Sequence, residues 1–309
     1  MKFKVTFKSF KTYNYFKSIY MESGVILLFD FFIIGEDLRL ISLANLFDYK
    51  DFNVLVYETD CEKLNKKIKQ TNSIKFALKN SKNIICPIPF TKDNVFLNIK
   101  NKKIYIKNIL KHISHKNRMF GGCFPKEIIK ICEEKGIFVY DYMKNKKFIV
   151  YNSISTAEAA IARAVLKNPI NMHDSNCLVL GFGNCGKLIC NKLKGFCSKI
   201  YVSSNDVTER IWAKAFGYYF LGLDSLRLKL EKFDYVFNTI PKKIFDDDML
   251  NCLKKNVYIL DLTNVGFNKK DCLKRSIHFE YIAGIPGLYK HLSSSKILAD
   301  LILKIINKF

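Results

Sequence analysis

The amino-acid sequence predicts an α/β protein of two doubly wound parallel-sheet domains with a cleft between them. Three observations predict this class. The chain has 309 residues, which is more than one hydrophobic core usually serves. Short apolar runs alternate with helix-length segments, as they do where crossover helices join parallel strands. The pattern then starts afresh near Tyr151, which indicates a second domain.

The first domain is expected over residues 24–150. Residues 1–23 are basic and aromatic without clear periodicity, so we interpret them as a poorly ordered extension, with Met21 as an alternative start. Strands are expected at residues 25–34, 53–57, 83–86 and 136–140. Between the first two, the segment from Gly35 to Arg39 is predicted to be a turn that opens a helix through Leu46.

The second domain is expected over residues 151–290. Ser155 and Glu158 form a capping-box pattern, which predicts that an interdomain helix opens there and stops before Pro169. Strands are expected at residues 177–180, 199–202, 235–238, 257–262 and 278–282, with helices in the segments 181–193 and 206–216. Residues 291–309 are expected to form a last helix that packs back on the first domain.

Composition excludes several classes of function. The net charge of +23 comes from lysines spread along the whole chain, without a recognisable nucleic-acid-binding motif, so no nucleic-acid partner is expected. No apolar run reaches the roughly 18 residues of a membrane span, which predicts a cytoplasmic protein. The ten cysteines include no Cys-x-x-Cys pair, and His112 and His115 have no further ligands nearby, so we expect reduced thiols and no metal site.

A glycine motif follows the apolar run at residues 178–180 and precedes a helical pattern. In this context it predicts a Rossmann turn, in which backbone N–H groups and a helix N-terminus bind the pyrophosphate of a nicotinamide dinucleotide. Its residues are Gly181, Phe182, Gly183, Asn184, Cys185 and Gly186. The alternative is a tight turn without a ligand. The helix N-terminus would lower the pKa of the Cys185 thiol, although a small residue tolerated in the turn is the simpler interpretation.

The segment after the second strand of this domain bears on the choice between NAD and NADP. An NAD site usually has an acid there, about 20 residues beyond the glycines, whereas this chain has Ser203, Ser204 and Asn205. Without the acid, a 2′-phosphate could be bound by the serines and Arg210, which favours NADP over NAD. Asp206 comes slightly late and alternatively caps the next helix.

Further cofactor contacts are expected where later strands end, because open α/β sheets bind ligands at the carboxyl ends of their strands. The candidates are Asn238, Thr239, Ile240, Pro241 and Asp261. Each has a simpler alternative, an ordinary strand-terminating turn or a helix cap. The five histidines supply no obvious general base; His173 lies in the loop before the glycine strand and is either catalytic or an exposed loop residue.

Several segments together resemble one known family, the A subunits of dipicolinate synthase from endospore-forming bacteria. Residues 151–158 are similar to that family's Asn-Ser-x-Pro-Thr-x-Glu signature, and residues 34–39 to its Gly-Gly-Asp-x-Arg opening. Residues 237–241, 259–262 and 286–287 also match in order and spacing. Among the departures, Ser155 replaces Pro, Asn184 and Cys185 replace Arg-Thr, and Asn205 replaces Arg, which counts against NADP.

The resemblance implies the nicotinamide-dependent oxidation of dihydrodipicolinate, or of its hydrated precursor, to dipicolinate in the mother cell of a sporulating bacterium. It also implies a dicarboxylate substrate and a hetero-oligomer in which the partner is a flavoprotein-like B subunit. Substrate contacts are then expected from Asp37 and Arg39 on one side of the cleft and from Asn152, Ser153 and Thr156 on the other. The catalytic group is open, with Ser153, Thr156 and His173 as candidates.

Two other functions fit the same motifs. A stand-alone dehydrogenase of the shikimate or 2-hydroxyacid type would turn over without a partner protein. A non-catalytic subunit would bind the nucleotide and stabilise or regulate its partner, which would suit the lack of a clear general base.

Overall fold

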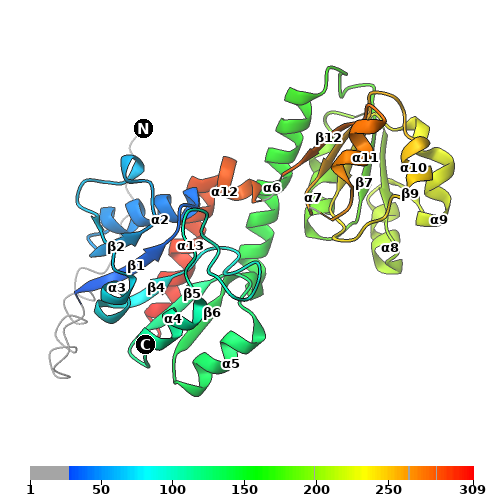
Figure 1. Cartoon of the computed structure of the whole chain (residues 1–309). Coiled ribbons are helices and arrows are strands. Elements are labelled where there is room, and N and C mark those ends of the chain that lie inside the picture. The colour runs from blue at the N-terminus through cyan, green and yellow to red at the C-terminus, as the bar shows by residue number, and fades with distance from the viewer. Residues whose placement is uncertain (1–27, 198, 264, 283) are drawn as a thin grey trace. The chain divides into compact units, whose positions relative to one another are not determined.

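A computed structural model describes residues 28–309, apart from 198, 264 and 283 (Figure 1). The predicted extension, residues 1–23, therefore lies outside the described residues. The chain divides between Tyr142 and Met143 into two compact units, called here the first unit and the second unit. Each contains one six-stranded sheet with helices around it, and every strand pairing is parallel. The prediction of two doubly wound parallel-sheet domains is confirmed.

The sheet of the first unit has the strand order β3-β2-β1-β4-β5-β6. Its strands are β1 (Phe29–Ile34), β2 (Val54–Tyr57), β3 (Lys69–Gln70), β4 (Ser81–Ile85), β5 (Arg118–Gly121) and β6 (Phe138–Asp141). Its α-helices are α2 (Leu38–Tyr49), α3 (Ile74–Asn80), α4 (Ile106–His112) and α5 (Lys126–Glu134). The sequence did not reveal β3, which is two exposed residues long, or β5, which begins with Arg and ends with Gly.

The sheet of the second unit has the order β12-β11-β10-β7-β8-β9. Its strands are β7 (Asn176–Leu180), β8 (Lys199–Ser203), β9 (Tyr219–Leu221), β10 (Tyr235–Asn238), β11 (Tyr258–Asp261) and β12 (His278–Tyr281). The chain runs outward from β7 to β9 and returns to pair β10 with the other side of β7. The order therefore reverses between β7 and β10, and such a switch point is where Rossmann folds bind dinucleotides.

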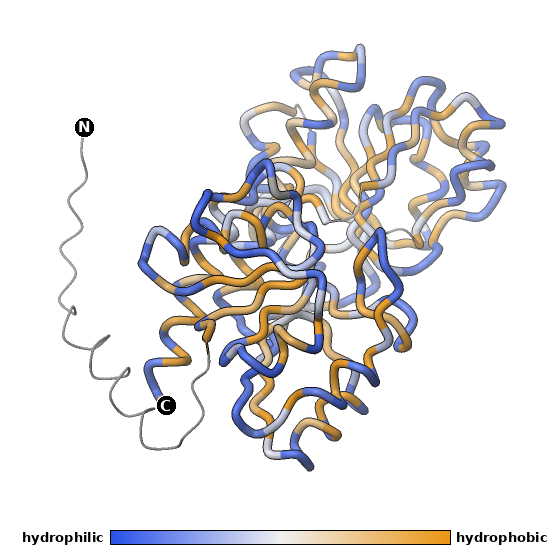
Figure 2. The backbone as a smooth tube through the Cα atoms, turned by 60° about the vertical axis from the view of Figure 1, so that its left-hand side comes forward, coloured by the Kyte–Doolittle hydropathy of each residue, from blue (hydrophilic) through white to orange (hydrophobic). Residues whose placement is uncertain are grey.

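The second unit also contains several α-helices. They are α6 (Lys146–Lys167), α7 (Asn184–Leu193), α8 (Val207–Ala215), α9 (Leu223–Leu226), α10 (Asp247–Asn251), α11 (Lys269–Lys274), α12 (Ile285–Tyr289) and α13 (His291–Ile306). Within the unit α6 packs against α7, α12 and α13. The central strands are buried on both faces, as expected for parallel strands under helices, and they are mostly hydrophobic in Figure 2.

The predicted capping box at residues 155–158 is wrong. Helix α6 begins nine residues earlier than expected, at Lys146, where the Asn145 side chain accepts a hydrogen bond from the backbone of Phe148 at 3.0 Å. Ser155 and Thr156 are buried inside the helix, and the Thr156 hydroxyl donates to the carbonyl oxygen of Asn152 at 2.8 Å. A hydroxyl satisfied by the preceding turn does not need to cap a helix end, so the pattern marks no helix start here.

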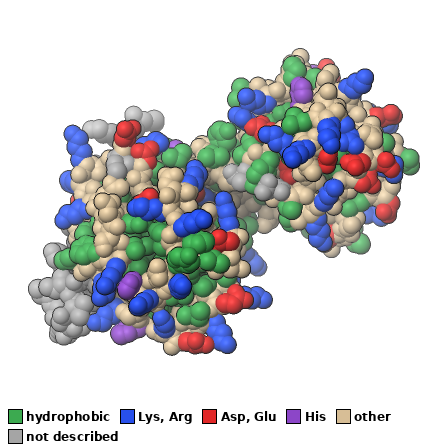
Figure 3. All heavy atoms as spheres, viewed as in Figure 1, with side chains coloured by type: hydrophobic (Ala, Val, Ile, Leu, Met, Phe, Trp, Pro, Cys, Tyr) green, Lys and Arg blue, Asp and Glu red, His purple; other side chains and the backbone are tan. Residues whose placement is uncertain are grey.

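Charged side chains, helix composition and possible metal ligands can be examined directly in the described residues. Lys and Arg side chains are scattered over both units on the face seen in Figure 3, without gathering into one patch. Among the described residues, none of the helices combines the length and the apolar character needed to cross a membrane. The same residues contain no cluster of three His, Cys, Asp or Glu side chains that could hold a metal ion.

Candidate functional site

Three glycines shape the turn between β7 and α7. Gly181 has a φ of +87°, and a Cβ there would lie 2.6 Å from the Thr239 hydroxyl oxygen. A Cβ on Gly186 would collide with the carbonyl oxygen of Gly181, whereas one on Gly183 would meet only the Glu209 carboxylate, at 3.7 Å. The first glycine is thus required by the backbone and the third by close packing of helix on strand, as a dinucleotide-binding turn needs.

The N-terminus of α7 is open. Its N-cap is Gly183, which has no side chain to accept from the helix, and the first backbone bond of the helix runs from Lys187 N to Gly183 O at 2.9 Å. The N–H groups of Asn184, Cys185 and Gly186 precede that bond and lack partners within the helix. Together with the positive end of the helix dipole they can bind an anion such as a pyrophosphate.

Two side chains of the turn, those of Phe182 and Cys185, are packed against protein. Phe182 is fully buried and packs edge-on against Tyr218, with ring centroids 5.7 Å apart, so only its backbone can reach a ligand. Burial raises the pKa of the Cys185 thiol, and a hydrogen bond with Ser153 opposes that shift only in part. The expected lowering of this pKa by the helix N-terminus is wrong, because desolvation of the thiolate outweighs it.

The end of β8 holds the serines expected near the adenosine. Ser203 is fully buried, and its hydroxyl has no partner among the described residues. Ser204 is also buried, whereas Asn205 is exposed. Asp206 accepts from Glu209 N at 2.9 Å and is the N-cap of α8, which is the simpler of the two roles that the sequence left open. None of these side chains presents a cation.

Glu209 is the site residue that sequence reasoning missed. Its carboxylate oxygen Oε2 accepts from Phe182 N at 2.8 Å and from the Ser204 hydroxyl at 2.6 Å. The carboxylate therefore lies against the glycine turn, although Glu209 belongs to the first turn of α8. The only sequence signal was its spacing, because Asp206 followed by Glu three residues later resembles a capping box and suggests a purely structural role.

A buried hydrogen-bond network joins the ends of β10 and β11. Asp261 is fully buried, and its oxygen Oδ1 accepts from Asn238 Nδ2 at 2.9 Å and from the Thr263 hydroxyl at 2.7 Å. Its other oxygen accepts from Gly266 N at 3.1 Å. Asn238 and Asp261 thus hold the two loops in place, and both side chains already have protein partners.

Thr239 bridges the switch point. Its hydroxyl donates to the carbonyl oxygen of Leu180 at 2.7 Å, which ties the end of β10 to the end of β7 directly before the glycine turn. The neighbouring Ile240 N donates to the Asn238 side chain at 3.0 Å, and Pro241 is exposed. This segment therefore lies beside the turn, as expected for a border of the dinucleotide site.

In the first unit, Asp37 and Arg39 pair with each other. Asp37 is the N-cap of α2 and accepts from Arg39 N at 2.8 Å. The guanidinium of Arg39 forks onto the same carboxylate, with Nε 3.0 Å from Oδ1 and Nη2 2.5 Å from Oδ2. Arg39 is only 4% exposed, and its Nη2 also donates to the carbonyl oxygen of Ile88 at 3.4 Å, so the guanidinium is held in a fixed position beside Asp37.

In the second unit, the other predicted substrate and catalytic residues separate into two groups. Asn152, Ser153 and Thr156 share α6, and Ser153 lies close enough to Cys185 of the glycine turn to influence the pKa of its thiol. The Ser153 hydroxyl donates to Ile149 O at 2.8 Å. His173 instead precedes β7, at the amino end of the strand whose carboxyl end enters the turn, and its side chain is 88% exposed. The structure does not bring His173 to the turn.

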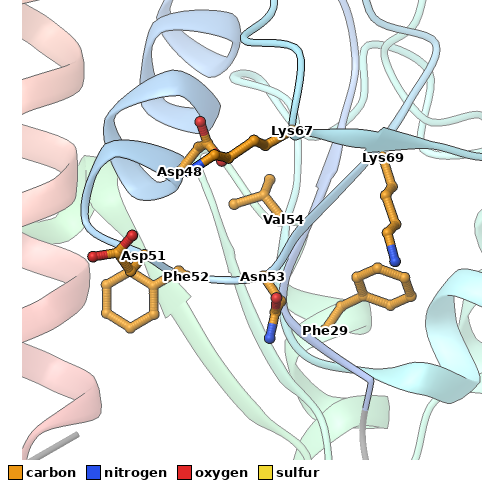
Figure 4. A pocket seen from close by; sticks show the side chains of 8 residues that line it. All are labelled: Phe29, Asp48, Asp51, Phe52, Asn53, Val54, Lys67 and Lys69. Atoms are coloured by element: carbon orange, nitrogen blue, oxygen red, sulfur yellow. The ribbon is translucent and has the colours of Figure 1, made fainter.

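A pocket of about 170 Å³ lies elsewhere in the first unit (Figure 4). It is lined by Phe29, Asp48, Asp51, Phe52, Asn53, Val54, Lys67 and Lys69. Phe29 and Val54 begin β1 and β2, so the pocket borders the amino ends of these strands. Open α/β sheets bind ligands at the carboxyl ends of their strands. We therefore assign this pocket no part in the dinucleotide site.

Comparison with known proteins points to one family. A model of the N-terminal domain of the dipicolinate synthase A subunit matches residues 30–143. The dipicolinate synthase A subunit of Bacillus subtilis (strain 168) is 26% identical over 159 residues, which are 51% of this chain and 54% of that protein. The resemblance to dipicolinate synthase A subunits is confirmed. The alignment spans about half the length of that relative.

Solved structures extend the likeness in fold to both units. The crystal structure of the dipicolinate synthase A subunit from Bacillus halodurans has a TM-score of 0.77 at 20% identity, and the match covers 91% of this chain and 99% of that one. An L-alanine dehydrogenase matches with a TM-score of 0.58 at 10% identity, over 89% of this chain and 88% of its own. The chain thus has a dehydrogenase-like fold.

Proposed function

We propose that this chain is a dipicolinate synthase A subunit that binds a nicotinamide dinucleotide at the glycine turn and oxidises dihydrodipicolinate, or its hydrated precursor, to dipicolinate. The open N-terminus of α7 at the switch point supports this proposal most strongly. There, a left-handed glycine, an uncapped helix and three N–H groups outside the helical ladder come together. The family suggests that the partner is a flavoprotein-like B subunit and that the pair works in the mother cell during sporulation.

In this proposal the chain mainly positions its ligands. The N–H groups of α7 hold the pyrophosphate, and the segment from Thr239 to Pro241 borders the nicotinamide ribose. A nicotinamide dinucleotide held there would supply the hydride acceptor, and aromatisation of the substrate ring would favour the reaction. Correct placement of the donor carbon then supplies much of the rate.

Five residues are proposed to form the binding site of the dicarboxylate substrate: Asp37, Arg39, Asn152, Ser153 and Thr156. The hydroxyls of Ser153 and Thr156 already donate to helix carbonyls. Arg39 is the only one of the five side chains with a positive charge. Because Ser153 lies beside Cys185 of the turn and His173 lies at the other end of β7, Ser153 is the stronger candidate for contact with the reacting part of the substrate. Asp37 would keep Arg39 in place.

Reconstitution tests the activity. The full chain is mixed with its candidate B subunit, with dihydrodipicolinate or its hydrated precursor, and with either NAD or NADP, and the absorbance of dipicolinate is followed. We expect product only when both proteins are present. Product without the B subunit would indicate the stand-alone dehydrogenase instead. No product from a folded pair would remove the enzymatic assignment.

A proline substitution tests the binding site itself. Asn184→Pro removes one N–H at the first position of α7, where proline fits a helix, and Gly183 already has an extended ψ of −163° that suits a following proline. We expect about tenfold weaker binding of the reduced dinucleotide with an unchanged melting temperature. The matched control is Val207→Pro, at the first position of α8 after an extended Asp206, which should bind normally.

The non-catalytic subunit remains a second candidate because the fully buried carboxylate at the site is engaged. Asp261 accepts hydrogen bonds from three neighbours, so it is not free to take a proton from a substrate. This candidate predicts tight dinucleotide binding, and stabilisation of the B subunit, with no turnover in the same reconstitution.

A further inference from the structure

The carboxylate of Glu209 occupies a defined place beside the glycine turn. Its Oε2 is 2.8 Å from Phe182 N and 2.6 Å from the Ser204 hydroxyl, and both groups donate to it. Its other oxygen, Oε1, lies 3.7 Å from where a Cβ would stand on Gly183. Oε2 is therefore held by hydrogen bonds within the protein, and Oε1 lies next to Gly183, where the dinucleotide is proposed to bind.

Capping of α8 does not require this carboxylate. Asp206 caps the helix by accepting from Glu209 N at 2.9 Å. The Asp206 N–H, which a capping-box glutamate would satisfy, donates instead to the Ser204 hydroxyl at 3.1 Å. The Glu209 side chain therefore contacts the glycine turn and not the N-terminus of its own helix. Helix capping does not explain this position.

We propose that Glu209 accepts the ribose hydroxyls of the adenosine half and makes the site selective for NAD over NADP; this rests on the proposed function. An acid at the end of the second strand normally does this in NAD-binding Rossmann domains. Here β8 ends in serines, and Glu209 supplies the carboxylate from the first turn of the following helix. A carboxylate accepts from two hydroxyls but repels a 2′-phosphate.

Two cations that could bind a 2′-phosphate, Arg210 and Lys187, lie near aromatic rings. Arg210, expected from the sequence to bind a 2′-phosphate, has its guanidinium carbon 5.7 Å from the ring centroid of Phe220. Lys187 Nζ lies 5.8 Å and 5.9 Å from the ring centroids of Phe182 and Trp212. The proposal therefore runs against the preference for NADP that the missing acid after β8 predicts.

The test measures affinities for NADH and NADPH by nicotinamide fluorescence, using the full-length chain and two variants. For the unmodified chain we expect NADH to bind at least about tenfold tighter than NADPH. Glu209→Gln keeps the shape and an oxygen acceptor, so it should fold; we expect about tenfold weaker NADH binding and loss of the preference. Glu231→Gln, on an exposed surface of the same unit, should leave both affinities unchanged.

Each other outcome overturns a different statement. Equal or tighter binding of NADPH by the unmodified chain refutes the selectivity while the proposed function stands, and this result needs no variant. If the chain binds neither nucleotide but Glu209→Gln binds both, the carboxylate closes the turn, which contradicts a ribose contact. If neither protein binds either nucleotide, the proposed function itself fails. Melting temperatures of the free proteins show whether Glu209→Gln is folded.

Discussion

The two units have the same strand order but differ at the first turn after the central strand. In the first unit, β1 leads into Gly35, with a φ of +115°, and α2 is capped by the Asp37 carboxylate, which also binds Arg39. In the second unit, the corresponding helix α7 has Gly183 as its N-cap and no side chain over its end. The N-terminus of α2 is thus occupied by a carboxylate of the chain itself, whereas the N-terminus of α7 is open to an anionic group of a ligand.

The comparison teaches that strand order alone does not make a nucleotide site. Both sheets bring a helix N-terminus to the switch point, yet the N-cap residue decides whether the N–H groups there are available. Function follows the residues of the site and not the fold that carries them. The predictions below test this difference, beginning with the change that should disturb the open turn most.

Gly186→Ala should disturb the open turn strongly. Its Cβ would collide with the Gly181 carbonyl oxygen, so strand and helix must separate, at a cost of about 3 kcal/mol in the free energy of unfolding. Dinucleotide binding should be lost. Urea unfolding followed by fluorescence reports on this unit, because Trp212, the single tryptophan of the chain, belongs to it.

The matched control is Gly195→Ala, where a Cβ would meet nothing within 4 Å. It should change stability by less than about 0.5 kcal/mol and leave binding intact. Equal effects of the two substitutions would show that the close approach at Gly186 does not shape the turn.

Asp37→Ala tests the closed turn of the first unit. The change removes the cap of α2 and leaves the guanidinium of Arg39, which is 4% exposed, without its carboxylate. We expect a loss of about 3 kcal/mol, measured by circular dichroism during urea unfolding. Asp206→Ala removes a cap that has no such ion pair, so it should cost only about 1 kcal/mol. Similar losses would mean that Asp37 acts merely as a cap.

The sequence predicted much of the fold because its signals were local. The apolar strands β7, β10 and β11 and the glycine motif were recognisable from neighbouring residues alone. The strand β3 was not, because it consists of two exposed polar residues that are defined as a strand only by their backbone pairing with the buried strand β2. The start of α6 was misplaced because the hydroxyls of Ser155 and Thr156 can serve a helix interior as well as a helix end.

The candidate site was only partly predictable for the same reason. Backbone donors follow from the glycine spacing, so the turn was found. The Glu209 contact depends on how α8 is set against that turn, which brings together residues 27 positions apart. Likewise, burial around Cys185 reversed the expected direction of its pKa shift, and burial is a property of packing that no local pattern contains.

Two threonines allow a closer comparison of the turns. The Thr239 hydroxyl donates to Leu180 O at 2.7 Å in the second unit, and the Thr59 hydroxyl donates to Gly35 O at 3.0 Å in the first. Thr239→Val and Thr59→Val should each cost about 1 kcal/mol of unfolding free energy. Only Thr239→Val should also weaken NADH binding. Weaker binding in both variants would assign the first unit a part in holding the dinucleotide.

The smallest expected effect concerns Glu158 of α6, which forms an ion pair with α7 at a distance from the glycine turn. Its carboxylate pairs with Lys192 of α7 at 3.0 Å and with Lys290 at 3.6 Å. The hydrogen bond from Lys192 is the main cause that lowers its pKa below the ordinary 4.5. A lowered folded-state pKa gives stability that is present above about pH 4.5 and is lost as the pH falls through the folded value.

Glu158→Gln should therefore be less stable than the unmodified chain near pH 7, and the two stabilities should converge in acid. Because the side chain is 40% exposed, solvent and salt screen the pair, and the gap near pH 7 should stay below about 1 kcal/mol. Unfolding followed by Trp212 fluorescence at pH 7 and pH 3, in low and high salt, measures it. A gap that widens in acid would contradict the assigned direction of the pKa shift, since only a carboxylate that is more acidic in the folded state loses its advantage on protonation.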